Sequence, residues 1–208
     1  MSDVNGFQSA TVYIVDDDAS FLTATSRLLR ASGFAVRTFA AAGDFLAQRE
    51  AESAGCVVAD LQMPEMNGLD LQTALARTGN PLPILFLTGH ADIPSTVRAM
   101  RDGAEDFLEK RAPKEKLLDA VKRALARDAR ERGQRTRRRE LRALFDSLSE
   151  RELEVLGHVV QGRLNKQIAA DLSIHERTVK LHRTAITTKL GVPSVAELTR
   201  LAHEAGLV

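Results

Sequence analysis

The chain is poor in cysteine and holds no long hydrophobic run. Cys56 is its only cysteine, which excludes an internal disulfide and favours a reducing compartment. No apolar run approaches the roughly 20 residues that span a bilayer. Residues 1–10 lack the basic stretch followed by an apolar stretch that marks a secreted protein. These absences predict a soluble, cytoplasmic protein without a membrane segment.

Net charge is also small, at +1 for the 208 residues, but it is unevenly divided. Residues 1–125 carry 13 Lys and Arg against 17 Asp and Glu, a net charge of −4. Residues 126–208 carry 16 against 11, a net charge of +5. The length allows two domains, each with its own core. The division predicts an acidic half suited to a divalent cation and a basic half suited to phosphate backbones.

Short apolar runs alternate with helical patterns through residues 11–125. The runs that we expect to be strands are Thr11–Val15, Ala35–Phe39, Cys56–Ala59, Leu82–Leu87 and Asp106–Leu108. The segments with helical spacing are 19–32, 43–50, 67–78, 93–102 and 113–126. Right-handed crossovers between such strands give a parallel sheet with helices on both faces. We predict an α/β doubly wound domain with a five-stranded parallel sheet, whose functional crevice lies at the carboxyl ends of the strands.

The rest of the chain is basic and helical in pattern. Eight arginines occur close together, at Arg127, Arg130, Arg132, Arg135, Arg137, Arg138, Arg139 and Arg142. They predict a helical linker over residues 126–146 that extends the preceding helix and carries a solvated basic face. Four helical segments follow with no strand between them, near 149–161, 165–172, 176–190 and 194–205. We therefore expect an all-α domain of four helices.

Four aspartates stand at the carboxyl ends of predicted strands. Asp16, Asp17 and Asp18 directly follow the first predicted strand, and Asp60 directly follows the third. Converging carboxylates repel and raise one another's pKa unless a positive group intervenes. A helix N-cap explains Asp18 well but does not explain the other three together. Since Mg²⁺ prefers oxygen ligands and keeps several waters, the pattern predicts a Mg²⁺ site in the crevice.

Two further strand ends carry groups that suit phosphoryl chemistry. Thr88 follows the fourth predicted strand and Lys110 follows the fifth. A hydroxyl can donate to a phosphoryl oxygen, and an ammonium can neutralise its charge. Each residue alone is typical of an ordinary turn or a solvated strand end, so the combination with the aspartates is what favours a phosphoryl site.

Short motifs at these strand ends carry a family resemblance. They are Val15-Asp16-Asp17-Asp18, Asp60-Leu61-Gln62-Met63-Pro64 with Asn67-Gly68, Thr88-Gly89-His90 and Phe107-Leu108-Glu109-Lys110. Together they resemble the receiver domains of two-component response regulators, over residues 11–125. The resemblance implies a flavodoxin-like receiver domain over residues 1–125. It also implies that Asp60 accepts a phosphoryl group from a sensor histidine kinase.

The same resemblance implies roles for the other residues. The Mg²⁺ ligands that it implies are Asp16, Asp17, Asp60 and the backbone carbonyl of Gln62. Thr88 and Lys110 would contact the phosphoryl group, and Phe107 would turn inward when Thr88 moves toward it. For Phe107 the alternative is an ordinary core aromatic.

The chain departs from the receiver pattern after Lys110. Most receivers have a proline there, in a cis peptide, whereas this chain has Arg111 and places Pro113 two positions on. A cis bond costs about 2.5–4 kcal/mol before a residue other than proline, against roughly 0.5–1 kcal/mol before proline. We therefore predict a trans bond between Lys110 and Arg111.

Residues 165–190 have the spacing of a helix-turn-helix. A tight Ser173-Ile174-His175 turn separates the helical segments 165–172 and 176–190. In such motifs the second helix lies in the major groove and presents its N-terminal side chains to base edges. The residues that share one face of this helix are Val179, Ile186 and Leu190. Those that share another face are Lys180, Arg183 and Thr184. We expect the first face to pack and the second to read DNA.

A second family resemblance rests on four stretches and one glycine of this half. They are Leu148-Ser149-Glu150-Arg151-Glu152-Leu153-Glu154-Val155-Leu156 with Gly162, Asn165-Lys166-Gln167-Ile168-Ala169, Thr178-Val179-Lys180-Leu181-His182 and Lys189-Leu190-Gly191-Val192. They resemble the LuxR-type helix-turn-helix, over residues 147–205 of a domain that we place at 147–208. Ser149 and Glu152 also form a capping-box pattern at its start. This chain departs from the family pattern at His175, where the family usually has a serine that caps the second helix.

The LuxR-type resemblance implies two sets of DNA contacts. Base-facing positions are implied for Lys180, Leu181 and Thr184. Phosphate contacts are implied mainly for Lys166, Arg177, Thr178 and Arg183. The alternative is an exposed basic helix with no special purpose.

Taken together, the two halves resemble a response regulator of the FixJ/NarL type. That family implies a transcription factor whose partners are a sensor histidine kinase, double-stranded promoter DNA, RNA polymerase and, on phosphorylation, a second copy of the chain. One alternative is an orphan DNA-binding regulator without kinase control. Another is an aspartyl-phosphate phosphatase, but that class places a second aspartate two residues after its nucleophile, where this chain has Gln62.

Overall fold

The structure, a computed structural model, describes residues 10–89 and 92–207. It divides into two compact units, residues 1–132 and 133–208. The N-terminal residues 1–9 and the motif residues His90 and Ala91 lie outside the described residues. Among the residues that are described, we find no helix with the length and apolarity needed to cross a membrane.

The first unit is built on a five-stranded parallel sheet with the order β2-β1-β3-β4-β5. Its strands are β1 (Thr11–Val15), β2 (Ala35–Phe39), β3 (Gly55–Ala59), β4 (Ile84–Thr88) and β5 (Asp106–Glu109). The doubly wound, five-stranded fold is confirmed. The expected start of β4 at Leu82 is wrong, because Pro83 has no N–H to donate to a neighbouring strand. The strand begins after this proline and ends on Thr88 itself.

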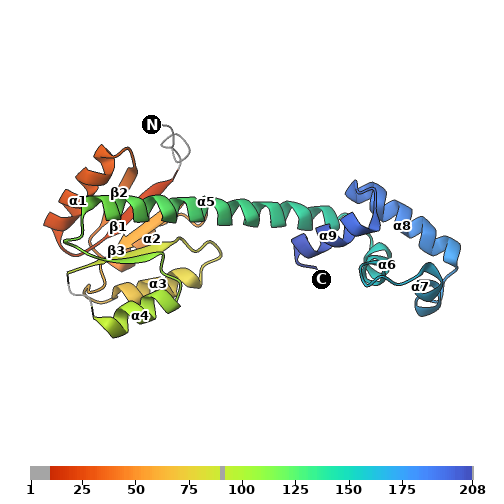
Figure 1. The fold of residues 1–208 in the computed structure, drawn as a ribbon. Coiled ribbons are helices and arrows are strands. Elements are labelled where there is room, and N and C mark those ends of the chain that lie inside the picture. The colour runs from red at the N-terminus through yellow and green to blue at the C-terminus, as the bar shows by residue number, and fades with distance from the viewer. Residues whose placement is uncertain (1–9, 90–91, 208) are drawn as a thin grey trace. The chain divides into compact units, whose positions relative to one another are not determined.

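Helices cover both faces of the sheet, with α5 crossing one face and α3 and α4 covering the other (Figure 1). Alternate residues of β1 divide between two cores: Val12 and Ile14 are buried on the side of α1 and α5. Tyr13 and Val15 are buried on the side of α2, α3 and α4. The helices are α1 (Ala19–Ala31), α2 (Ala42–Gln48), α3 (Gly68–Ala76), α4 (Ile93–Arg101) and α5 (Lys114–Phe145).

Side chains at the carboxyl ends of the strands begin the helices that follow. Asp18 accepts hydrogen bonds from the backbone N–H groups of Ser20 and Phe21 at 2.9 and 3.1 Å, and so caps α1. Asn67 caps α3 and Asp92 caps α4 in the same way. The N-cap interpretation of Asp18 is confirmed, which leaves Asp16 and Asp17 to account for.

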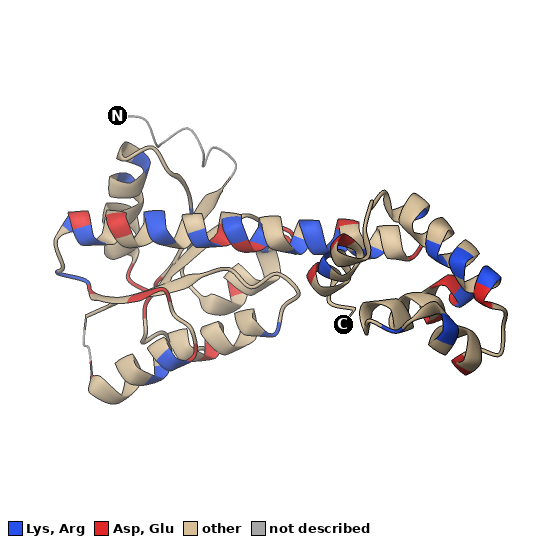
Figure 2. Ribbon diagram, turned by 45° about the vertical axis from the view of Figure 1, so that its right-hand side comes forward, with Lys and Arg blue, Asp and Glu red and all other residues tan. Residues whose placement is uncertain are grey.

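Helix α5 runs without a break through 32 residues and belongs to both units. Leu117 and Val121 from its first turns are buried in the core of the first unit. Leu141 and Phe145 from its last turns are buried in the core of the second. The arginine-rich segment is therefore helical and continues the preceding helix, as the sequence predicts. Basic residues recur along this helix, with acidic residues between some of them (Figure 2).

Several linker arginines are paired with acidic side chains of their own unit while they stay partly exposed to solvent. Arg127 bonds to Glu131 at 2.7 Å, and Arg132 lies 3.1 Å from the buried carboxylate of Asp128. The same carboxylate accepts a hydrogen bond from the backbone N–H of Gly55 at 3.0 Å, which ties α5 to the start of β3. In the second unit, Arg137 lies 3.1 Å from a carboxylate oxygen of Glu204.

The second unit is all-helical after the end of α5. Its further helices are α6 (Glu150–Val160), α7 (Asn165–Asp171), α8 (Glu176–Leu190) and α9 (Val195–Ala205). The capping box is present: Ser149 Oγ accepts from the N–H of Glu152, whose carboxylate accepts from the N–H of Ser149 at 2.7 Å. Buried apolar residues from α6, α7, α8 and α9 form one core with the end of α5. The predicted four-helix domain is therefore observed.

Candidate functional site

The register of the parallel sheet brings the acidic strand ends together. Val15 pairs with Ala59 across β1 and β3, so the residues that follow each strand emerge side by side. The N–H of Asp60 then donates to the carbonyl of Val15 at 2.9 Å. On the other side of the crevice, the N–H of Lys110 donates to the carbonyl of Thr88 at 2.8 Å. Backbone hydrogen bonds thus fix where these side chains start.

Three carboxylates and one ammonium meet in this crevice. One carboxylate oxygen each from Asp16, Asp17 and Asp60 lies within 4.8 Å of the others. Lys110 Nζ lies 2.7 Å from Asp16 Oδ2 and 2.8 Å from Asp60 Oδ2. When all four groups are ionised, the ammonium offsets only one of three negative charges. The remaining charge and the oxygen donors fit a divalent cation such as Mg²⁺.

Two groups of the crevice, Asp16 and Lys110, have shifted pKa values. Burial raises the pKa of Asp16 above its ordinary value, although the hydrogen bond from Lys110 lowers it in part. Burial lowers the pKa of Lys110, but its hydrogen bonds to Asp16 and Asp60 outweigh this and raise the pKa overall. Lys110 is therefore held as a cation against the carboxylates. A positive charge is thereby available where a phosphoryl group would bring negative charge.

Gly68 contributes to the site through its lack of a side chain. A Cβ at this position would lie 2.4 Å from the carbonyl oxygen of Asp60 and 2.8 Å from the Phe86 ring. The N–H of Gly68 also donates to the carbonyl of Leu61 at 2.9 Å. The start of α3 can therefore pack directly beneath the loop that carries Asp60. The sequence shows Gly68 only as part of a motif, and the contact that requires glycine depends on the fold.

Thr88 and Phe107 lie next to the acidic crevice. Thr88 is buried at the end of β4, and Phe107 is half-buried on β5. The Phe107 ring packs against Phe86, with ring centroids 5.9 Å apart. Gln62 lies at the acidic loop, where its N–H donates to Asp60 Oδ1 at 3.4 Å. The metal role of the Gln62 carbonyl and the switch role of Phe107 stay predictions.

The loop after Lys110 has the geometry that the sequence predicts. Across the described residues the structure contains no cis peptide, so the bond between Lys110 and Arg111 is trans. The Arg111 guanidinium is exposed and pairs with Glu109 at 2.9 Å. The N–H of Ala112 donates to the carbonyl of Glu109 at 2.8 Å and closes a turn. Arg111 therefore points away from the crevice, and Lys110 alone of the two reaches the carboxylates.

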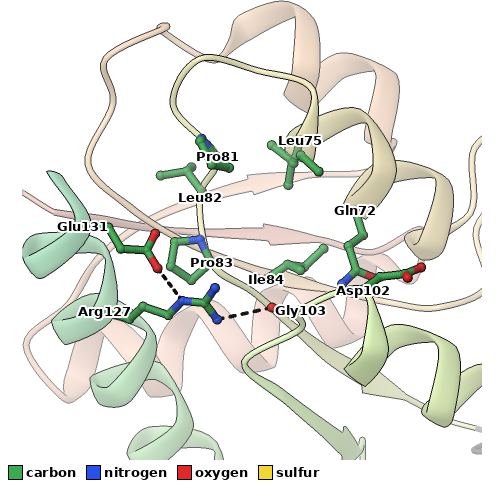
Figure 3. A pocket seen from close by; sticks show the side chains of 11 residues that line it. Gln72, Leu75, Pro81, Leu82, Pro83, Ile84, Asp102, Gly103, Arg127 and Glu131 are labelled. Atoms are coloured by element: carbon green, nitrogen blue, oxygen red, sulfur yellow. Dashed lines mark hydrogen bonds and ion pairs between the residues drawn. The ribbon is translucent and has the colours of Figure 1, made fainter. Parts of the chain in front are cut away.

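A cavity of about 220 Å³ lies at the opposite end of β4 (Figure 3). Arg127 of α5 crosses it and bonds to the Gly103 carbonyl at 3.2 Å and to Glu131 at 2.7 Å. The residues that line its apolar side include Leu75, Pro81, Leu82, Pro83 and Ile84. Because Ile84 begins β4 and Thr88 ends it, this cavity is separated from the acidic crevice by the length of the strand. The cavity lies beside Arg127 and Glu131 of α5 and takes no part in the acidic site.

The two faces of α8 differ in burial as expected. Val179 and Ile186 are completely buried and Leu190 nearly so, which confirms the packing face. Lys180 and Thr184 are exposed on the other face, and the side chain of Leu181 is 63% exposed. The face that carries Lys180, Leu181 and Thr184 is therefore open to solvent.

Of the remaining predicted DNA contacts, Lys166 lies at the start of α7, Arg177 and Thr178 lie at the start of α8, and Arg183 lies in the middle of α8. Lys166 and Arg177 are exposed, and Thr178 is half-buried. Arg183 donates to Asn165 Oδ1 at 2.8 Å, so it links α8 to the start of α7. Lysines and arginines recur along α8 (Figure 2). All seven predicted residues therefore lie on the two helices of the motif, and their individual contacts stay predictions.

The turn between α7 and α8 contains a backbone conformation that the sequence does not reveal. Ser173 has a φ of 53°, in the left-handed region that favours glycine. The N–H of Ile174 donates to the carbonyl of Ala169 at 3.0 Å, which closes the end of α7. His175 stands at the N-cap of α8 but makes no side-chain capping bond to the described residues. Because this chain has histidine where the family usually has serine, α8 lacks a side-chain N-cap bond within the part of the chain that the structure describes.

Comparison with known proteins supports both halves of this description. The family model for the response regulator receiver domain matches residues 12–122. The model for bacterial regulatory proteins of the luxR family matches residues 146–202. Between them, the two matches cover the acidic crevice and both helices of the helix-turn-helix.

Relatives and solved structures match nearly the whole chain. The response regulator protein TmoT of Ectopseudomonas mendocina is 44% identical over 94% of this chain and 89% of its own length. The transcriptional regulatory protein FixJ of Azorhizobium caulinodans is 38% identical over 96% of this chain and 95% of its own length. A low-resolution structure of the response regulator StyR is 45% identical, covers 94% of this chain and 99% of its own, and has a TM-score of 0.80. The crystal structure of full-length FixJ from B. japonicum is 36% identical, covers 96% of this chain and 98% of its own, and has a TM-score of 0.58. The chain therefore belongs to the response regulators that join a receiver domain to a LuxR-type DNA-binding domain, and it is a transcriptional regulator.

Proposed function

We propose that Asp60 is the residue that accepts a phosphoryl group, from the phosphohistidine of a sensor kinase in the cytoplasm. A carboxylate oxygen of Asp60 forms a bond to phosphorus as the bond between phosphorus and the histidine nitrogen breaks. The freed imidazole nitrogen takes a proton from solvent. The observation that carries the proposal is that Lys110 contacts Asp60 at 2.8 Å while Thr88 stands at the neighbouring strand end.

The protein's own groups prepare Asp60 for this step. Lys110 can transfer its hydrogen bond from the Asp60 carboxylate to a phosphoryl oxygen, and the Thr88 hydroxyl can donate to another. Mg²⁺, when bound by the carboxylates and the Gln62 carbonyl, offsets the charge that grows on the phosphoryl oxygens. The ligands proposed for it are Asp16, Asp17, Asp60 and the carbonyl of Gln62.

Labelling with acetyl phosphate and Mg²⁺ tests this proposal. Wild-type protein should gain the mass of one phosphoryl group, and Asp60→Asn should gain none because the nucleophilic carboxylate is gone. Asp18→Asn is a matched control, since this aspartate caps α1 and lies outside the proposed ligand set. Labelling of the Asp60→Asn protein at a rate close to that of wild type would contradict the assignment. Rapid turnover of acetyl phosphate without a lasting adduct would favour a phosphatase.

The phosphoryl group is proposed to control pairing of two receiver units through α4, β5 and α5. On α4, the apolar side chains of Ile93, Val97 and Met100 are 80%, 49% and 45% exposed. They recur at intervals of four and three residues, so they form one stripe along the helix. Thr88 and Phe107 lie between Asp60 and this face, and a movement of Phe107 inward would change it.

Sedimentation of the full chain tests the pairing. Protein treated with acetyl phosphate and Mg²⁺ should show a higher mass than untreated protein, and Ile93→Ser with Val97→Ser should remove the increase. Leu153→Ser is a control, because this leucine is also exposed but lies on α6 of the other unit. An unchanged mass at concentrations that saturate DNA binding would contradict this proposal.

In the second unit, α8 is proposed to lie in the major groove of promoter DNA. Lys180, Leu181 and Thr184 would face base edges there. The proposed phosphate contacts are Lys166, Arg177, Thr178 and Arg183. RNA polymerase is the further partner proposed for a regulator bound at a promoter. If wild-type protein binds a selected site equally well with and without labelling at Asp60, the orphan regulator is the better description.

A further inference from the structure

An aromatic ring outside the proposed phosphoryl-binding residues lies directly on Lys110. The Lys110 Nζ atom is 4.5 Å from the centroid of the Phe21 ring. A cation within about 6 Å of a ring centroid and over the ring face is attracted by the electrons of that face. Lys110 is therefore held from two directions, by the carboxylates of Asp16 and Asp60 and by Phe21.

The position of Phe21 is fixed by the acidic loop itself. Its backbone N–H donates to Asp18 Oδ1 at 3.1 Å, within the cap that begins α1. The ring is half-buried and packs against the core on the side of α1 and α5. The same short segment therefore supplies Asp16 to one side of the ammonium and the ring to another. The Phe21 ring therefore contacts the Lys110 ammonium without any movement of α1.

The space around Lys110 explains why such a ring matters. A cavity of about 220 Å³ adjoins Phe21 and Lys110 on the side of α1 and α5. Other residues that line it are Ala24, Thr25, Leu28, Leu87, Ala112, Lys114 and Leu117. The Lys110 side chain is 20% exposed and flexible, so it has room to move away from the carboxylates. The Phe21 ring and the Lys110 side chain both line this space, and the ring centroid lies 4.5 Å from the ammonium.

We propose that Phe21 is a positioning residue for phosphoryl transfer, which keeps the Lys110 ammonium aimed at Asp60. This inference rests on the proposed phosphorylation of Asp60. When Asp60 becomes phosphorylated, the ammonium must leave the free carboxylate and contact a phosphoryl oxygen. The ring allows this small movement while it opposes the larger movement into the cavity. Phe21 itself touches neither the phosphoryl donor nor the proposed metal ligands in this role.

Labelling rates of Phe21 variants provide the first test. With acetyl phosphate and Mg²⁺, Phe21→Leu should lower the second-order rate constant of Asp60 labelling by about fivefold, which lies within the range of cation–π energies. Phe21→Tyr retains an aromatic face and should stay within about twofold of wild type. Leu28→Ala is the matched control, because it opens the same cavity without removing the ring. It should label at the wild-type rate.

A double-mutant cycle separates positioning from a general effect on folding. In a Lys110→Ala background, Phe21→Leu should cause no further loss of rate, because there is no ammonium left to position. A loss of similar size with and without Lys110 would overturn the inference. Melting temperatures of all variants show whether the receiver unit remains folded at the assay temperature.

Nuclear magnetic resonance gives a readout that requires no phosphorylation. The ring current of Phe21 should shift the ε-methylene protons of Lys110 upfield in wild type and in Phe21→Tyr, but not in Phe21→Leu. Absence of this shift in wild type would overturn the inference. A wild type that shows the shift but is never labelled overturns the proposed function. A labelled wild type whose rate is unchanged by Phe21→Leu overturns only the role of Phe21.

Discussion

The acidic crevice and the surface of α8 place their functional residues in opposite ways. In the crevice, side chains from the ends of β1, β3 and β5 meet within hydrogen-bond distance, and backbone hydrogen bonds fix where they start. On α8, Lys180, Leu181 and Thr184 stand on an exposed helical face and point toward solvent. The first site is complete before its ligand arrives, because the sheet assembles it. The second depends on the shape of the DNA for its geometry.

Gly68→Ala is the strongest test of how tightly the crevice is built. The new Cβ would meet backbone at 2.4 Å, so the start of α3 or the Asp60 loop must move. We expect a loss of at least about 1–3 kcal/mol in the free energy of unfolding of the receiver unit. Labelling at Asp60 should fall as well. Chemical denaturation and acetyl phosphate labelling measure the two effects.

Gly43→Ala is the matched control for that experiment. Gly43 lies in α2, and a Cβ there would meet nothing within 4 Å. Alanine is the better helix former by up to about 1 kcal/mol, so this variant should be neutral or more stable. If Gly68→Ala proved as harmless as Gly43→Ala, the close approach of α3 to Asp60 would be wrong.

The DNA-binding surface is best examined with two lysines from different helices. Lys180→Ala should weaken binding to a selected site by about 1–3 kcal/mol more than to scrambled DNA, because base contacts carry the sequence preference. Lys166→Ala should weaken both about equally, and should lower the slope of log affinity against log salt by about 0.9 per bound subunit. Binding isotherms on both DNAs across a salt series measure these differences. An unchanged ratio for Lys180→Ala would reduce the α8 surface to a general electrostatic anchor.

The smallest expected effect concerns pH and the interior of the DNA-binding unit. A hydrogen bond from Lys189 at 2.7 Å and the capping bond from the Ser149 N–H lower the pKa of Glu152 below its ordinary value. A carboxylate whose pKa is lower in the folded state stabilises that state above its unfolded pKa, and the contribution is lost as pH falls through the folded value. The melting temperature should therefore fall in this acidic range.

Two variants isolate this contribution. Glu152→Gln should melt lower than wild type near neutral pH and should lose less stability as the solution is acidified. Lys189→Met should reduce the same pH dependence from the partner's side. Equal acid sensitivity in wild type and in Glu152→Gln would mean that other carboxylates dominate the acid unfolding of this unit.

The sequence predicts what depends on strand ends and helix periodicity. The alternation of apolar runs was sufficient for the parallel sheet, and that fold places Asp16, Asp60 and Lys110 in one crevice. The three-and-four spacing on α8 was sufficient for its buried and exposed faces. Each of these follows from a local pattern combined with a general rule of topology.

Contacts that depend on tertiary approach could not be read in this way. Nothing local indicates that Gly68 lies against the Asp60 carbonyl or that the Phe21 ring lies on Lys110. The left-handed backbone of Ser173 is equally hidden, because serine does not signal a positive φ. Pro83, in contrast, is a local signal. Its missing N–H moves the start of β4 from the expected Leu82 to Ile84.

Helix α5 also determines how the protein can be divided into working pieces. A receiver fragment that ends at residue 125 leaves out Asp128, whose carboxylate satisfies the N–H of Gly55. A DNA-binding fragment that starts at residue 147 leaves out Leu141 and Phe145, which fill its core. A cut between residues 132 and 133 avoids both losses. Either half can therefore be exchanged as a module only if the helix is divided inside its own length, between Arg132 and Gly133.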